Sequence, residues 1–182
     1  GPEMLEWVEK SSPCSFHIVE GYSDYHPEHP GGLPSGGRSL DNALFPLPEL
    51  GEWAKKIRND GMRSPVMITE TPLGGAAAPP SSEVMRDRTE RGESGMGLAL
   101  VAALLKGVVD RGIEPEIESR ALRLLKDGTG ICGVSIKSGD SEKEVIARKG
   151  IIIATGGFEW NPELVRTFLR GPMTAPVGNP EN

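Results

Sequence analysis

The chain has 182 residues, including 24 glycines and 16 prolines, and a formal net charge of −6 with acidic and basic residues interspersed. This charge balance leaves no basic face for nucleic acid, and a loop-rich chain of this length can bury one core or two small ones. No apolar run is long enough to span a membrane, because the longest, residues 98–109, is interrupted by Lys106.

The sequence carries no signal peptide, and Cys14 and Cys132 show neither a disulfide framework nor metal-ligand spacing. We therefore expect a reducing, cytoplasmic location. The chain starts with Gly1-Pro2 and ends without a closing element, which predicts an internal piece of a longer protein, although Gly-Pro is also what a cleaved tag would leave.

The N-terminal region predicts a helix over residues 2–11, ended by Pro13, and a strand over residues 14–19. Residues 21–40 are rich in Pro and Gly and have no periodicity, which predicts a long loop. Long loops in compact domains are usually functional or disordered, so this segment is a candidate for function.

Two histidines in this loop, His26 and His29, stand near Asp24 and Glu28 and raise the question of a metal site. Pro27 and Pro30 favour an extended segment in which the imidazoles share no face, and no second group of ligands follows. Zinc normally needs three or four protein ligands in a recognisable spacing, so we expect no metal site here.

Apolar spacing predicts a helix over residues 47–59 that ends near Gly61, and residues 62–92 are expected to be mostly a connector with a short strand at 66–69. A second helix should run from a Ser94 cap to about Arg111. Its predicted buried side consists of Leu98, Val101, Leu104, Leu105 and Val108. Gly95 and Gly97 weaken its first turn, so a close approach of a neighbour or a cofactor is expected there.

Four strands are predicted next, over residues 116–119, 121–125, 131–137 and 144–148, with tight turns that make a β-meander. Residues 128–133 match the dinucleotide motif G-x-G-x-x-G. That motif requires a helix after it to hold phosphate, whereas Val134-Ser-Ile-Lys alternates like a strand. The match therefore predicts a hairpin turn and no cofactor contact.

The C-terminal part predicts a strand, a glycine turn and a helix. Ile151–Ile153 is a short β-branched run, which favours a strand buried on both faces. Ala154, Thr155, Gly156 and Gly157 follow as a turn of small residues, and a helix capped by Asn161 should run to Gly171. In open α/β sheets, ligands bind beside such turns at the carboxyl ends of strands.

The run Ala154-Thr-Gly-Gly-Phe-x-x-Asn161 resembles the second nucleotide-contacting strand of the FAD-dependent fumarate reductase and 3-ketosteroid dehydrogenase superfamily. Asp24-Tyr25, with Gly37-Arg38-Ser39 after it, resembles the 3-ketosteroid Δ1-dehydrogenases. The order of helix, strand, meander and Ala-Thr-Gly strand also resembles this superfamily over nearly the whole chain, least clearly in residues 62–90.

The resemblance implies an α/β fold: part of one Rossmann-like FAD-binding domain with a parallel sheet, flanking helices and a small antiparallel meander. Within it, residues 1–61 would form the substrate side, 62–92 the connector and 93–182 the nucleotide-binding portion. The G-x-G-x-x-G unit would precede this sequence and the cap domain would follow it. The resemblance also implies roles for single residues. The backbone of Ala121 would face adenine, and Tyr25 would be catalytic. The residues expected to contact FAD are Ala154, Thr155, Gly156 and Gly157.

The implied activity is FAD-dependent dehydrogenation of the carbon–carbon bond next to a ketone, on a ketosteroid-like substrate. Two alternatives stay open. One is a fumarate reductase or succinate dehydrogenase-like flavoprotein, for which Arg38 and His26 are the local candidates to hold carboxylates. The other is a non-catalytic fragment that binds no cofactor by itself. The oligomeric state is not indicated by the sequence.

Overall fold

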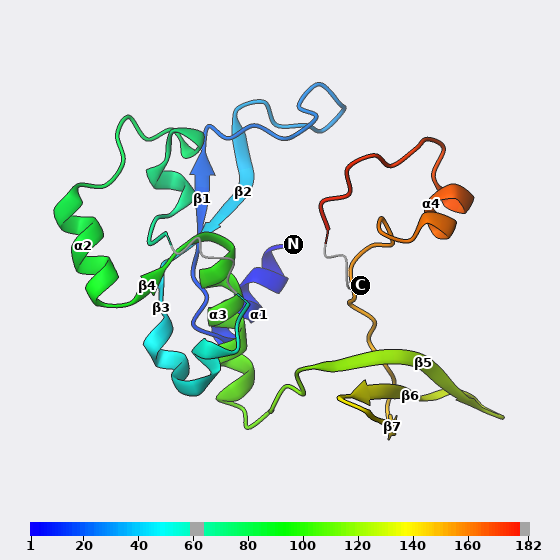
Figure 1. The fold of residues 1–182 in the computed structure, drawn as a ribbon. Coiled ribbons are helices and arrows are strands. Elements are labelled where there is room, and N and C mark those ends of the chain that lie inside the picture. The colour runs from blue at the N-terminus through cyan, green and yellow to red at the C-terminus, as the bar shows by residue number, and fades with distance from the viewer. Residues whose placement is uncertain (59–63, 179–182) are drawn as a thin grey trace. The chain divides into compact units, whose positions relative to one another are not determined.

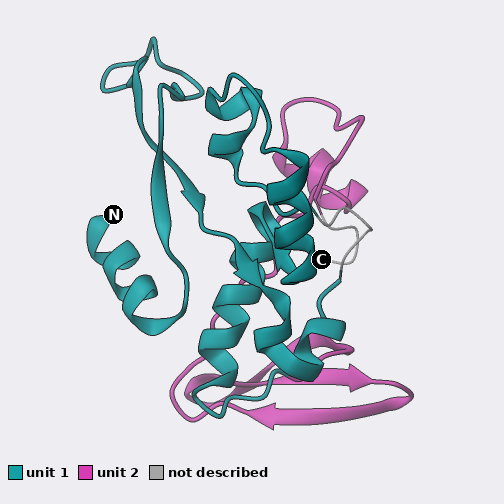
Figure 2. Cartoon of the chain, turned by 90° about the vertical axis from the view of Figure 1, so that its left-hand side faces the viewer, with its two compact units in different colours: residues 1–115 teal, residues 116–182 magenta. Residues whose placement is uncertain are grey.

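The computed structural model describes residues 1–58 and 64–178. The chain divides into two compact units, residues 1–115 and residues 116–182, which Figure 2 distinguishes by colour. Each unit has its own sheet and helix elements and is described by itself below.

The first unit begins with the predicted helix, α1 (Pro2–Ser11), and continues into a two-stranded antiparallel sheet (Figure 1). Strand β1 (Phe16–Glu20) pairs with β2 (Gly36–Asn42) from Phe16 opposite Asn42 to Glu20 opposite Gly36. The prediction of a loop as far as Leu40 is therefore wrong for its last five residues. Their glycines and polar side chains show no strand pattern, and only pairing with β1 makes them a strand.

The core of the first unit surrounds helix α3 (Met96–Val109). Helix α3 packs against the 3₁₀-helix η1 (Leu47–Lys55) and against a pair of short strands, β3 (Phe45–Pro46) and β4 (Glu93–Ser94). The buried apolar residues of this core cluster are Cys14, Phe45, Leu47, Leu50, Ala99, Ala102 and Ala103. The predicted 47–59 helix is thus a shorter 3₁₀-helix, kinked at Gly51 with φ 56°, and its predicted end near Gly61 lies outside the described residues.

The buried side of α3 agrees with the predicted one only in part, because Leu98 and Leu105 are partly buried against the core. Ala99, Ala102 and Ala103 face the core, whereas Val101 is 51% exposed and Leu104 is 40% exposed. The helix is apolar on every side, so its periodicity does not identify the face that packs. The helix cap also differs, because Gly95 holds that position and Ser94 is buried in β4.

The connector is more structured than predicted. It contains two short 3₁₀-helices, η2 (Ile68–Glu70) and η3 (Pro72–Gly74), and the helix α2 (Ser82–Glu90), whose first turn is capped by the Ser81 hydroxyl. The predicted strand at 66–69 is wrong. Helix α2 has almost no apolar residues, so the periodicity that predicts helices is missing from it.

Polar contacts attach this connector to the rest of the first unit. Arg88 in α2 forms a bidentate pair with Glu70, at 2.6 and 2.7 Å, and also donates to the Pro65 carbonyl. The buried carboxylate of Asp41 in β2 accepts hydrogen bonds from the backbone and the hydroxyl of Thr69. Because these groups are largely shielded from water, they fix the connector more firmly than surface pairs would.

The second unit contains the predicted antiparallel meander. Strands β5 (Ser119–Asp127), β6 (Gly130–Ser138) and β7 (Ser141–Ile146) pair in chain order, although residues 116–118 lie outside β5. The G-x-G-x-x-G match is the β5–β6 turn and the start of β6, as predicted. There Asp127 accepts hydrogen bonds from the backbone and hydroxyl of Thr129, which lower the pKa of its carboxyl group.

The predicted strand at residues 151–153 is absent, and the described residues form only antiparallel pairs in place of the expected parallel sheet. Ile152 is 94% exposed and Ile153 is 66% exposed. A strand needs a hydrogen-bonded neighbour, and no described segment lies beside this one as a strand. The closing helix is confirmed as α4 (Pro162–Phe168), with Asn161 accepting hydrogen bonds from Glu163 and Leu164.

None of the helices in the described ranges has both the length and the apolar character needed to cross a lipid bilayer.

Candidate functional site

Tyr25 lies in the loop between β1 and β2, and its side chain is 92% exposed. Residues Gly21, Tyr22, Ser23, Asp24, Tyr25 and Leu73 line an open cavity of about 400 Å³ beside it. A tyrosine that packs structurally would bury its ring, and this one does not. Its position leaves the phenol available to a ligand.

Asp24 holds the ends of this loop together. Its carboxylate accepts a hydrogen bond from the Leu33 backbone at 2.8 Å and lies 3.2 Å from the Arg38 guanidinium, while its own N–H donates to the Leu33 carbonyl. Arg38 also donates to the Gly31 carbonyl. The Asp24 and Arg38 side chains therefore fix the backbone on which Tyr25 is carried.

Gly36 marks the point where the loop re-enters the sheet. Its φ is +81°, and a Cβ there would lie 2.6 Å from the Tyr22 carbonyl oxygen. Any other residue would be strained at this φ and would also overlap the backbone of Tyr22. The close approach of these two residues keeps the loop narrow beside Tyr25.

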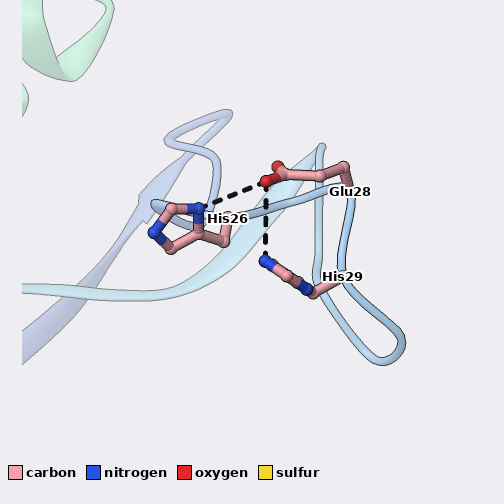
Figure 3. Close-up of side chains that lie close together, drawn as sticks. All are labelled: His26, Glu28 and His29. Carbon is pink, nitrogen blue, oxygen red and sulfur yellow. Dashed lines mark hydrogen bonds and ion pairs between the residues drawn. The ribbon is translucent and has the colours of Figure 1, made fainter.

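The histidines of this loop are arranged differently from the prediction. His26, Glu28 and His29 lie together at its tip, as Figure 3 shows, because the segment turns instead of running extended. Residue spacing alone could not show this convergence. The available signal was the repeated His-Pro pair, since Pro favours the second position of a turn.

The predicted cofactor-binding residues lie in the second unit, whereas Tyr25 lies in the first. Ala154, Thr155, Gly156 and Gly157 form an exposed segment without regular secondary structure, in which Gly156 has a φ of +84°. A Cβ at Gly157 would meet only the flexible side chain of Glu159. Because residues 154–157 have small side chains or none, a ligand can approach their backbone closely.

The residues after this segment form a loop and a helix beside it. Trp160 Nε1 donates to the Gly178 carbonyl at 2.7 Å, and the rings of Phe158 and Phe168 meet edge to face. An apolar cavity of about 310 Å³ opens there. It is lined by Gly157, Phe158, Glu159, Leu169, Met173, Ala175, Pro176 and Val177.

Ala121, the residue expected to face adenine, is exposed on β5. It pairs with Ile136 of β6, and the register shifts between Ala121 and Arg123, which forms a bulge next to it. Bulges redirect side chains and are common beside binding sites. The small side chain at position 121 leaves the strand accessible.

This geometry fits a nucleotide cofactor that is held by main-chain contacts. Gly156 has a backbone conformation that favours glycine, the four residues 154–157 are exposed, and no bulky side chain of theirs covers the segment. A nucleotide could therefore contact the backbone here and at Ala121.

Comparison with known proteins identifies relatives along the whole chain. A family model described as "FAD binding domain" matches residues 1–180. The 4-oxocyclohexanecarboxylate 2-dehydrogenase of Sinomonas cyclohexanicum is 30% identical over 100% of this chain and 32% of its own length. The 3-oxosteroid 1-dehydrogenase of Mycobacterium tuberculosis is 30% identical over 96% of this chain and 34% of its own length.

A solved structure has a similar fold. It is a 3-ketosteroid Δ1-dehydrogenase from Sterolibacterium denitrificans in complex with 1,4-androstadiene-3,17-dione, with a TM-score of 0.73 and 21% sequence identity. The similarity covers 95% of this chain and 35% of that one. The chain thus spans about a third of the length of the relatives that it matches.

Proposed function

Because the chain belongs to the FAD binding domain family and FAD is the cofactor of that family, we propose that the whole protein dehydrogenates the carbon–carbon bond next to a ketone, with a 3-ketosteroid as substrate. One observation carries this proposal: similarity along at least 96% of the chain to two dehydrogenases whose names both specify oxo compounds. The exposure of Tyr25, the residue that the resemblance implies to be catalytic, is compatible with it.

In this proposal the second unit holds the ADP half of the cofactor. Ala154, Thr155, Gly156 and Gly157 contact it through their backbone, and Ala121 faces the adenine. These residues are small and exposed, so the nucleotide approaches without displacing a side chain. FAD supplies an acceptor for the hydride that leaves the substrate.

Tyr25 takes part in the proton transfer. A carbon next to a ketone loses a proton more easily than an ordinary carbon, and the phenol of Tyr25 would serve as hydrogen-bond partner and relay that proton to a base in the rest of the whole protein. The Asp24–Leu33 and Asp24–Arg38 contacts keep the loop backbone in place while the tyrosine hydroxyl stays exposed.

The test is a steady-state assay of the full-length protein with an artificial electron acceptor. A 3-ketosteroid, 4-oxocyclohexanecarboxylate and succinate are offered separately, and flavin content is measured by absorbance. We expect turnover with the ketosteroid. Turnover with 4-oxocyclohexanecarboxylate alone would support dehydrogenation next to a ketone but would show that the substrate is not a 3-ketosteroid. Activity with succinate alone would overturn the proposal in favour of fumarate reductase-like chemistry.

A further inference from the structure

Two imidazoles and a carboxylate converge at the tip of the β1–β2 loop (Figure 3). His26 Nδ1 lies 3.2 Å from Glu28 Oε1, and His29 Nε2 lies 3.7 Å from the same oxygen. One potential ligand atom of each residue lies within 4.8 Å of the other two. The two rings are 5.2 Å apart and nearly perpendicular, so they do not stack on each other.

Two successive turns produce this convergence. The His29 N–H donates to the His26 carbonyl at 3.2 Å, and the Gly32 N–H donates to the His29 carbonyl at 2.8 Å. Pro27 and Pro30 occupy the second positions of these turns, where their fixed φ is favourable. Gly31 follows Pro30 with a φ of +84°, which is typical of a type II turn.

The base of the loop is closed independently of the histidines. Asp24 and Leu33 exchange backbone and side-chain hydrogen bonds, as described above. A Cβ at Gly32 would lie 2.7 Å from the Pro27 carbonyl oxygen, so the two turns pack against each other. The backbone that carries the three side chains is therefore ordered before any ligand arrives, which reduces the entropy cost of binding.

The three side chains do little for the stability of the fold. They are about two-thirds or more exposed, and ion pairs at such exposure contribute roughly 0–1 kcal/mol. Their donor set instead suits a metal ion, because imidazole nitrogen and carboxylate oxygen both bind zinc. Bonds of about 2.0–2.1 Å place tetrahedral ligand atoms roughly 3.3–3.4 Å apart, close to the two distances from Glu28.

We propose that His26, Glu28 and His29 form a binding site for a divalent transition-metal ion, for which Zn²⁺ is the test ion. Water completes the coordination, since all three residues lie at the surface. The site is separate from the residues assigned to FAD, and its occupancy does not depend on the dehydrogenase activity. His26 directly follows Tyr25, so a bound ion fixes the backbone on one side of that tyrosine.

The test measures the dissociation constant of Zn²⁺ by competition with a chromophoric chelator, without substrate. The variants are His26→Asn, His29→Asn and Glu28→Gln. The matched control is His17→Asn, because His17 is the third histidine of the chain and is exposed on β1, outside the loop. Circular dichroism of the metal-free proteins checks that each variant is folded, and glutamine replaces either histidine if the asparagine variant does not fold.

We expect one Zn²⁺ per chain, an affinity at least about tenfold weaker in each of the three loop variants, and no change in the control. Loss of a group that merely orients a metal ligand already costs about 10–100-fold, so loss of a ligand should cost no less. Equal affinity in wild type and all loop variants would overturn the proposal. A Co²⁺ spectrum dominated by thiolate charge transfer would overturn it as well, because the ion would then be bound by Cys14 or Cys132.

Discussion

At the scale of single residues, Tyr25 is the side chain on which the proposed proton transfer depends. Tyr25→Phe removes one oxygen from a ring that is already 92% exposed. The free energy of unfolding should therefore fall by no more than about 1 kcal/mol, the value of one hydrogen bond. Turnover should fall about a hundredfold or more, as is usual when a group that transfers a proton is lost.

The measurement for Tyr25 is steady-state dehydrogenation by the full-length protein, together with a thermal melt and a flavin spectrum. Tyr22→Phe is the control, because Tyr22 lines the same cavity and is more buried. Flavin content should stay constant in both variants. Unchanged turnover of Tyr25→Phe would exclude its hydroxyl from the proposed proton transfer.

Gly157 tests the cofactor assignment. A Cβ there meets only the mobile end of Glu159, so Gly157→Val should fold, yet its branched side chain would occupy the space beside the backbone. We expect a lower flavin content in the full-length variant, and the same for Gly156→Val, where the φ of +84° adds strain.

Gly128→Val is the matched control for Gly157. Gly128 belongs to the G-x-G-x-x-G match, but it lies in the β5–β6 turn and a Cβ there would meet nothing within 4 Å. Its flavin content should equal that of the wild type. Loss of flavin in the Gly128 variant alone would reverse our interpretation of both segments.

At the scale of elements, two glycines at the start of α3 should change the stability of the protein in opposite directions when each is replaced by alanine. A Cβ at Gly95 would overlap the Val66 carbonyl, whereas a Cβ at Gly97 would meet nothing within 4 Å. Gly95→Ala should destabilise the protein by about 1–3 kcal/mol, as overpacking does. Gly97→Ala should stabilise it by up to about 1 kcal/mol, because alanine is the better helix former. Urea unfolding midpoints measure both changes, and a midpoint raised by Gly95→Ala would refute this close approach.

The Glu70–Arg88 pair joins η2 to α2 and should make stability depend on pH. Hydrogen bonds from Arg88 are the main reason why the pKa of Glu70 is lowered from its ordinary value of 4.5. The Glu70 carboxylate therefore contributes its full share to the free energy of unfolding at pH values above the pKa of Glu70 in the unfolded chain. That share is lost as the pH falls through the lower pKa of Glu70 in the folded protein. Glu70→Gln should cost about 2 kcal/mol at neutral pH and less in acid.

Chemical unfolding of Glu70→Gln at neutral and acidic pH measures this dependence. Glu90→Gln is the control, since Glu90 faces Arg86 at 4.0 Å on the surface and should change stability by less than about 0.5 kcal/mol. If Glu70→Gln lowered the free energy of unfolding as much in acid as at neutral pH, the cause would be packing disturbed by the amide and not the loss of an ion pair.

The elements that the sequence predicts well are those with local signals. Asn161 caps α4 through its own side chain, and the turns after Asp127 and Ser138 define the meander. The elements that it missed depend on distant partners: β2 needs β1, and α2 is held by the Arg88–Glu70 pair rather than by an apolar face. Propensity and periodicity contain no information about such partners.

The candidate site follows the same rule. Tyr25 and the small residues at 154–157 could be selected from the sequence because motif residues are local; both segments are exposed, and their roles stay predictions. The convergence of His26 with His29 was missed, because it depends on how two consecutive turns pack on Gly32. Interpreting each proline as extending the chain gave the opposite geometry.

At the scale of the whole molecule, we expect the chain to supply only part of the contacts that the proposed cofactor needs. It spans about a third of its relatives, and no described helix follows a glycine-rich phosphate loop of the dinucleotide type. Helix N-termini supply the oriented N–H groups that bind phosphates. We therefore expect the 182-residue chain alone to bind FAD weakly or not at all.

Equilibrium dialysis against FAD measures this affinity, with the full-length protein as the reference. The full-length protein should retain its flavin through dialysis while the chain alone loses it. Stoichiometric retention by the chain alone would show that Ala121 and residues 154–157 suffice to hold the cofactor.

The run of three isoleucines at 151–153, of which Ile152 and Ile153 are exposed, has a consequence for handling the chain in solution. Its unpaired backbone and β-branched side chains are the features that favour stacking of identical segments into cross-β aggregates. Arg148 and Lys149 precede it, separated from Ile151 by Gly150 alone, and such flanking charges act as gatekeepers against that stacking. Because salt screens these charges, concentrated samples of the chain should remain dispersed longest at low ionic strength.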